Sequence, residues 1–150
     1  MSAFLDLVRS HPVAEFQIGD ILLEQRHHTG RLLVLLEGEV EVLRDGVRVG
    51  KASEPGACFG EMSVLLDRAH TASVRALRPC RVAVIENPRD FLTREPAAAL
   101  QIAELLARRL DALNKYLIDV KLQYEGHDHL AMVDDVLETL MHRQPRTVAR

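Results

Sequence analysis

Between residues 13 and 86, short apolar segments alternate with turn signals, and this spacing constrains the fold more than any other feature of the chain. The clearest pair is 40–43 and 47–49, where apolar and polar side chains alternate as on a half-buried strand. Asp45 and Gly46 lie between these segments. An Asp-Gly pair favours a type I′ turn because glycine accepts a positive φ. The pattern therefore predicts an antiparallel hairpin.

Further segments follow the same pattern, at residues 21–23, 32–36, 72–76 and 81–85, with glycines and a Pro-Gly pair as punctuation. Several short strands with regular turns are typical of a β-sandwich or a small closed barrel, and they argue against alternating strand–helix–strand units. An apolar-periodic piece within residues 1–11 adds two or three helical turns. We predict a mainly β fold with flanking helices.

The C-terminal part changes to a helical pattern. Asn87 and Pro88 are a typical helix start, with Asn as N-cap and Pro at the first helical position. Pro96 begins a second stretch that contains neither Gly nor Pro up to Tyr124. Its apolar residues recur in heptads, namely Ala103, Leu110, Leu117 and Tyr124 at one position and Leu106, Leu113 and Val120 at the other. Three heptads favour a coiled-coil homodimer through helix 97–124, although a helix packed on its own domain also needs an apolar stripe. A last amphipathic segment spans residues 130–141.

Composition limits the class of protein. A chain of 150 residues with 47% apolar and 27% charged residues corresponds to about one folded domain. The 19 Lys and Arg against 22 Asp and Glu give a net charge of −3, unlike the basic surface of a nucleic-acid binder. No apolar run is long enough to cross a bilayer and no signal-peptide pattern is present, so we expect a cytoplasmic protein without a membrane partner. Cys58 and Cys80 are expected to be reduced thiols.

Residues 55–74 hold the densest set of candidate binding residues. A glycine-flanked turn, residues 59–63, leads into a short apolar turn with helical character. Gly60 allows close backbone approach, and the N–H groups at a helix start attract anions. Glu61 supplies a fixed carboxylate that accepts hydrogen bonds from sugar hydroxyls. These residues alone indicate either a cradle for a ligand with phosphate and sugar, or an ordinary structural turn.

The order Phe-Gly-Glu, a short helix and then Thr-Ala-Ser-Val resembles the phosphate-binding cassette of cyclic nucleotide-binding domains, a family that includes CRP/FNR-like sensor domains. Other matching positions span about residues 12–122: Phe16, Gly19, Asp20, Leu22, the run 33–40, Asp45-Gly46, Pro55-Gly56, Asp90-Phe91, Pro96 and the run 106–110. The resemblance implies an eight-stranded β jelly roll that holds a cyclic mononucleotide, followed by a long C-terminal helix over the base. The implied domain covers residues 1–124, with the jelly roll at 13–86 and helices at 87–124, and a short helical extension follows at 125–150.

The resemblance also implies residue roles. Glu61 accepts the ribose 2′-hydroxyl, and the backbone on either side of it lines the sugar. Ser63 adds a hydroxyl near the phosphate, while Thr71 and Ala72 contact the phosphate and sometimes the base. The alternatives are that Ser63 satisfies the helix start and that Thr71 is an ordinary strand residue. The complete expected ligand site is Phe59, Gly60, Glu61, Met62, Ser63, His70, Thr71 and Ala72.

One position departs from the family pattern. Where the family has a Pro-Arg pair before this Thr-Ala, the chain has Ala69 and His70. The planar fork of arginine donates charge-assisted hydrogen bonds worth about 1.5–3 kcal/mol each, so its loss weakens phosphate binding by about 10- to 150-fold. Three hypotheses follow. His70 is a weaker phosphate partner that binds better as the pH falls from about 8 to 6, or Arg68 supplies the guanidinium instead, or the pocket has lost nucleotide binding and accepts another small ligand or none.

We therefore expect a sensor or regulatory protein that binds cAMP, or else cGMP, and signals to an unidentified protein partner by moving its C-terminal helix. The alternative is a nucleotide-free jelly-roll module that acts as a protein–protein interaction or scaffold domain. Only 26 residues follow Tyr124, too few for a helix-turn-helix, so a stand-alone sensor that does not bind DNA is expected. No catalytic triad order, metal-ligand cluster or phosphate-transfer loop is present, so we expect no enzyme, no metal and no cofactor.

Overall fold

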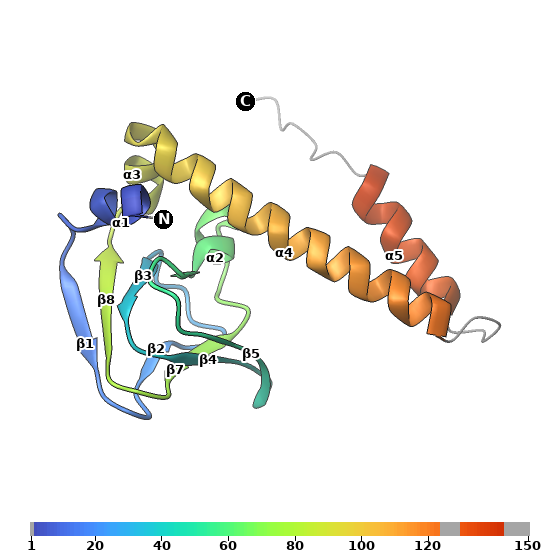
Figure 1. Cartoon of the computed structure of the whole chain (residues 1–150), viewed down its shortest axis with the longest axis horizontal. Helices are drawn as coiled ribbons and strands as arrows, with labels where there is room; N and C mark the ends of the chain where they lie inside the picture. Colours follow the sequence, from blue (N-terminus) through green and yellow to red (C-terminus); the bar gives the residue numbers. More distant parts are fainter. Residues whose placement is uncertain (1, 124–129, 143–150) are drawn as a thin grey trace. The chain divides into compact units, whose positions relative to one another are not determined.

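The computed structural model describes residues 2–123 and 130–142 (Figure 1). The chain divides into two compact units, Met1–Ala103 and Glu104–Arg150, and each is described by itself. The predicted domain boundary at residue 124 falls outside the described residues, so the division into 1–124 and 125–150 stays a prediction.

The first unit contains two four-stranded antiparallel sheets. Their strand orders are β1-β8-β3-β6 and β2-β7-β4-β5. The strands are β1 (Val13–Phe16), β2 (Ile21–Leu23), β3 (Leu32–Glu37), β4 (Val40–Arg44), β5 (Val47–Ala52), β6 (Cys58–Phe59), β7 (Ser73–Ala76) and β8 (Cys80–Ile85). The helices are α1 (Ser2–Val8), α2 (Glu61–Leu66) between β6 and β7, α3 (Pro88–Arg94) and the start of α4 (Pro96–Gln123). These eight strands confirm the predicted mainly β jelly-roll fold with flanking helices.

The hairpin between β4 and β5 has the predicted turn. Asp45 has φ 51° and Gly46 has φ 79°, the two positive angles that a type I′ turn requires. Arg44 pairs with Val47 directly across this turn. The local Asp-Gly signal therefore sets the register at the end of this strand pair.

The core lies between the two sheets. It is formed by Leu23, Leu33, Leu35, Val40, Phe59, Val74, Ala76, Cys80 and Val82. Gly38, at φ 115°, lets the turn between β3 and β4 pass close to Cys80, because a Cβ at this position would lie 2.6 Å from the Cys80 sulfur. Burial raises the pKa of the Cys80 thiol, which favours its protonated form. At one end of the sheets, α1 and α3 lie beside β8 (Figure 1), where the rings of His11 and Phe91 meet edge to face at 4.8 Å.

The outer face of the second sheet carries a buried carboxylate. Glu41 of β4 is almost fully buried and is registered directly opposite Arg75 of β7. The Nε atoms of Arg48 and Arg75 each donate to a different oxygen of this carboxylate, both at 2.9 Å. The hydrogen bond from Arg48 is the largest cause that lowers the pKa of Glu41, burial opposes it, and Arg75 lowers the pKa further. The triad therefore holds three neighbouring strands together through one ionised group.

We expect Glu41→Gln to lower the melting temperature of the protein by several degrees at pH 7. Because the folded-state pKa of Glu41 lies below its ordinary value of 4.5, the triad stabilises the fold above that pH and loses its effect as the pH falls through the lowered pKa. Thermal unfolding followed by circular dichroism at several pH values checks this. The difference from wild type should shrink below about pH 4.5. Asp90→Asn is the control, since it breaks only an exposed pair with Arg94 and should change little. A gap between Glu41→Gln and wild type that does not vary with pH would contradict the role of the ionised group.

The second unit contains the rest of α4 and α5 (Leu130–His142). Lys121 of α4 forms an ion pair with Asp134 of α5. The predicted long helix is confirmed over Pro96–Gln123, whereas the last heptad residue, Tyr124, lies outside the described residues. Among the helices that the structure describes, none is long and apolar enough to cross a membrane.

Candidate functional site

The predicted binding segment forms β6, α2 and the connection into β7. Gly60 begins α2 as its N-cap, with φ 89°. A Cβ at this position would lie 2.6 Å from the carbonyl oxygen of Arg31, which is a rigid backbone atom. The segment therefore lies directly against the connection between β2 and β3, residues 24–31, which we call the 24–31 loop. Glycine is required at position 60 because of both its φ and this close approach.

Three polar side chains are buried in this segment. Glu61 is 7% exposed, Ser63 3% and His70 4%. The Ser63 hydroxyl donates to the carbonyl of Arg68, and the Arg68 N–H donates back to the Ser63 carbonyl at 3.1 Å. This exchange closes the C-terminal end of α2, where Asp67 adopts a left-handed conformation. In this conformation the Ser63 proton is already used, so it is not available to a phosphate.

His70 is held by the 24–31 loop. Its N–H donates to the His27 carbonyl at 2.9 Å, and its carbonyl accepts from the Arg26 N–H at 2.8 Å. Its ring atom Nε2 lies 2.8 Å from the Thr29 hydroxyl. Burial is the main cause that lowers the pKa of His70 below 6.5, and the nearby His28 and His27 lower it further. The imidazole is therefore neutral at pH 7 before any ligand binds.

The other predicted residues lie around this buried set. Phe59 is part of the core, and the Met62 side chain is exposed. Thr71 and Ala72 are half-buried immediately before β7. Arg68 is exposed, and its guanidinium has no hydrogen bond or ion pair with any described residue. The predicted site residues thus lie in one continuous segment. Within it, His70 contacts Thr29 and Ser63 donates to the Arg68 carbonyl.

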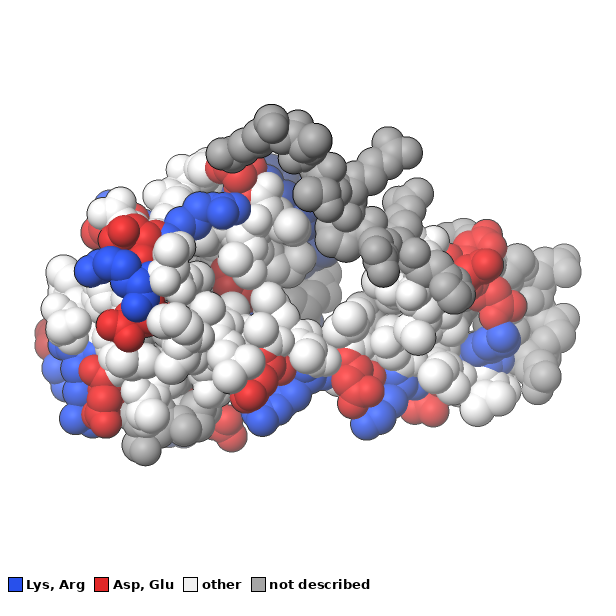
Figure 2. Space-filling view, turned by 90° about the horizontal axis from the view of Figure 1, so that it is seen from above, with Lys and Arg blue, Asp and Glu red and all other residues white. Residues whose placement is uncertain are grey.

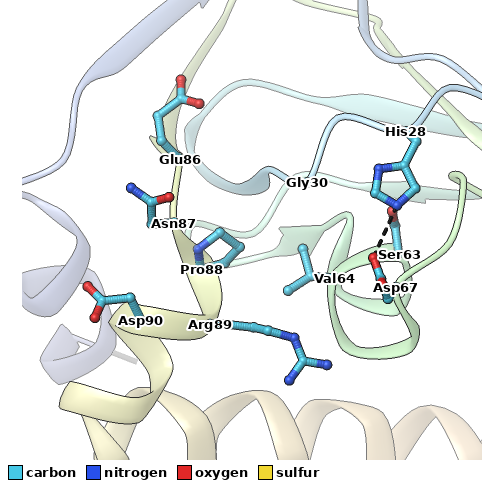
Figure 3. A pocket seen from close by; sticks show the side chains of 10 residues that line it. All are labelled: His28, Gly30, Ser63, Val64, Asp67, Glu86, Asn87, Pro88, Arg89 and Asp90. Carbon is cyan, nitrogen blue, oxygen red and sulfur yellow. Dashed lines mark ion pairs between the residues drawn. The ribbon is translucent and has the colours of Figure 1, made fainter.

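A pocket of about 420 Å³ lies on a neighbouring surface, and sequence reasoning missed it. It is lined by His28, Gly30, Ser63, Val64, Asp67, Glu86, Asn87, Pro88, Arg89 and Asp90, so it shares only Ser63 with the predicted ligand site (Figure 3). Val64 and Pro88 lie across its middle, and the Arg89 side chain extends below them (Figure 3). Arg89 donates to the Leu65 carbonyl at 3.1 Å, which joins α3 to α2.

Sequence reasoning also missed the 24–31 loop as part of the site. Thr29 lies 41 residues before His70, and nothing in the local sequence marks it. The neighbouring pair His27 and His28 is conspicuous in the sequence, but its relation to the binding segment follows only from the fold. His28 lies 3.3 Å from Asp67 at the end of α2, so the loop contacts both ends of the segment between α2 and β7.

Part of the chain is similar in sequence to two curated proteins. The cGMP-dependent protein kinase egl-4 of Caenorhabditis briggsae is 30% identical over 82 residues, which cover 55% of this chain and 11% of that protein. The cAMP-dependent protein kinase regulatory subunit of Yarrowia lipolytica is 32% identical over 62 residues, which cover 41% of this chain and 16% of that protein. The chain thus spans less than a fifth of the length of these relatives.

A solved structure shares the fold. The catabolite activator protein of Thermus thermophilus matches with a TM-score of 0.68 at 22% identity, over 95% of this chain and 82% of that one. The family described as the cyclic nucleotide-binding domain matches residues 13–92, which is more than half of the chain and includes both sheets and the buried segment. The chain belongs to the cyclic nucleotide-binding domain family.

Proposed function

We propose that this chain is a regulatory, non-catalytic domain that binds cAMP in the segment from Phe59 to Ala72. The observation that carries the proposal is the burial of Glu61 and His70 in the segment that resembles the phosphate-binding cassette. The two residues supply a carboxylate and an imidazole at the positions where the resemblance expects contacts with the ribose and the cyclic phosphate. Glu61 accepts a hydrogen bond from the ribose 2′-hydroxyl, and His70 contacts the cyclic phosphate.

The state of His70 sets the pH dependence of the proposed binding. The imidazole is neutral in the ligand-free protein because burial lowers its pKa. An adjacent phosphate raises that pKa again, since an opposite charge favours the protonated form. Binding is then coupled to proton uptake, so the affinity increases as the pH falls towards 6.

Calorimetric titration with cAMP, cGMP and 2′-deoxy-cAMP tests the proposal on the wild-type protein and on Glu61→Gln. We expect wild type to bind cAMP more tightly than 2′-deoxy-cAMP by about 10-fold or more, because a hydrogen bond to a charged group is lost. Glu61→Gln should discriminate less between the two ligands, which isolates the contact between Glu61 and the 2′-hydroxyl. Tighter binding of cGMP than of cAMP would mean that the domain prefers guanine to adenine as the base of its ligand. No binding of any cyclic nucleotide at millimolar concentration would contradict the proposal and favour a nucleotide-free scaffold.

For the output, we propose that α4 carries the signal and pairs with a second copy of the chain. Its heptad residues Leu110 and Leu113 are 42% and 48% exposed. On the face drawn in Figure 2, positive and negative side chains are interspersed, which supports a protein partner rather than DNA.

Leu110→Ala combined with Leu113→Ala is expected to convert the dimer into a monomer, because the heptad positions form the seam of a coiled coil. Sedimentation equilibrium measures the change. Leu122→Ala is the matched control, since this leucine is 65% exposed on the same helix but lies outside the heptad. A wild-type protein that stays monomeric at high concentration, or a double variant that stays dimeric, would contradict this interface.

A further inference from the structure

The contact between Thr29 and His70 has a chemical consequence for the proposed phosphate site. A neutral imidazole has one nitrogen that donates and one that accepts, and the hydrogen bond at one nitrogen determines the role of the other. Nε2 of His70 is engaged by the Thr29 hydroxyl at 2.8 Å. Nδ1 has no hydrogen-bond partner among the described residues. Nδ1 is therefore the ring nitrogen that can form a hydrogen bond with a ligand.

The surroundings of Thr29 favour one direction for this hydrogen bond. The N–H of Arg31 donates to the Thr29 oxygen at 3.3 Å. If the same oxygen also accepted from Nε2–H, no described residue would accept the hydroxyl proton, which would then point to the solvent around the exposed Thr29. If the hydroxyl instead donates to Nε2, both its oxygen and its proton have partners within the protein. The imidazole proton then resides on Nδ1.

We propose that Thr29 is a positioning residue that holds His70 in its Nδ1–H tautomer, so that the neutral imidazole donates a hydrogen bond to an anionic ligand oxygen. This rests on the proposed cyclic nucleotide function for the identity of the ligand, but not for the tautomer. It explains how a histidine replaces the arginine of the family without first becoming charged. The backbone hydrogen bonds of His70 to Arg26 and His27 keep the ring in register with Thr29.

Other charged or titratable groups near His70 come from the same loop and from the end of α2. His27 and His28 lie in the 24–31 loop, Asp67 is paired with His28 at 3.3 Å, and Glu61 lies in the same buried segment. The two histidines disfavour a proton on His70. A tautomer that donates while neutral is the arrangement that suits this environment, because it needs no added charge.

Nitrogen-15 NMR of the ligand-free protein reads the tautomer directly. The chain has seven histidines, so the His70 signals are assigned by comparison with His70→Gln. At pH 8 we expect wild type and Thr29→Ser to show Nδ1–H, and Thr29→Val to shift towards Nε2–H, the form that histidine favours in water. Thr93→Val is the matched control on α3 and should leave the His70 signals unchanged. Nε2–H in the wild type, or an unchanged tautomer in Thr29→Val, would overturn the proposal.

Calorimetric titration with cAMP then tests the role in binding. At pH 8, Thr29→Val should bind about 2- to 12-fold more weakly than wild type, which corresponds to the loss of one neutral hydrogen bond. The gap should narrow at about pH 5.5, because the bound phosphate favours the protonated form of His70 and a protonated imidazole donates from Nδ1 whatever its former tautomer. Thr29→Ser should restore the affinity. A gap that is equal at both pH values indicates a merely structural role and overturns the proposal. If the wild type binds no cyclic nucleotide, the proposed function fails, while the NMR result still decides the tautomer.

Discussion

Replacing His70 with arginine is expected to strengthen cAMP binding by about 10- to 150-fold at pH 7.5, because a charge-assisted hydrogen bond contributes about 1.5–3 kcal/mol. Arginine stays charged at this pH and donates two parallel hydrogen bonds to phosphate oxygens. The native imidazole is neutral there, since burial lowers its pKa. The pH dependence of the affinity should disappear as well, so that the His70→Arg variant binds cAMP equally well between pH 6 and 8. Calorimetric titration at several pH values measures both effects.

Two variants separate charge from geometry at this position. His70→Lys supplies a point charge without the planar fork, so its gain should be smaller than that of His70→Arg. Arg68→Ala tests the competing hypothesis that the exposed Arg68 guanidinium turns to the phosphate, and we expect it to leave the affinity unchanged. If a folded His70→Arg variant binds no better than wild type while Arg68→Ala loses affinity, position 70 does not face the phosphate.

The parts of the fold that the sequence predicts are those specified by nearby residues. Asp45 and Gly46 mark their turn in the local sequence, and the angles of 51° and 79° confirm it, although Gln25 and Arg26 also contact Asp45. Strand β6 could not be predicted in the same way. It has two residues, too few to show alternation, and it exists because Leu33 and Val34 of β3 pair with it. Its formation depends on partners distant in the chain.

In the candidate site too, contacts between nearby residues could be predicted from the sequence and contacts between distant residues could not. Residues 59–72 are contiguous, so the sequence alone shows their resemblance to the family pattern. It also shows where they depart from that pattern, at His70. What surrounds that histidine is invisible in the sequence, because Thr29 is an exposed loop threonine with no periodic pattern around it. Two backbone hydrogen bonds between the 24–31 loop and His70 bring them together. The hydrogen bond at Nε2 follows from this tertiary contact, and the lowered pKa of His70 follows mainly from its burial.

The contact between loop and binding segment can be broken by one methyl group. Gly60→Ala places a side chain at φ 89°, and a left-handed conformation costs a non-glycine residue about 1–3 kcal/mol. The new Cβ would also lie 2.6 Å from the Arg31 carbonyl oxygen, so the 24–31 loop must move. We expect a lower melting temperature and loss of cAMP binding, because the same loop positions His70. Thermal unfolding and calorimetric titration measure the two effects.

Gly46→Ala separates the collision from the backbone strain. Gly46 has a similar φ of 79°, but a Cβ there meets no heavy atom within 4 Å, and the residue lies in the β4–β5 hairpin outside the predicted site. This variant should therefore show only the conformational cost and keep its affinity for cAMP. The additional destabilisation of Gly60→Ala then measures the free-energy cost of the steric clash between the new Cβ and the 24–31 loop. Equal destabilisation in the two variants, with binding retained in Gly60→Ala, would mean that the loop yields easily and that His70 is positioned by the segment itself.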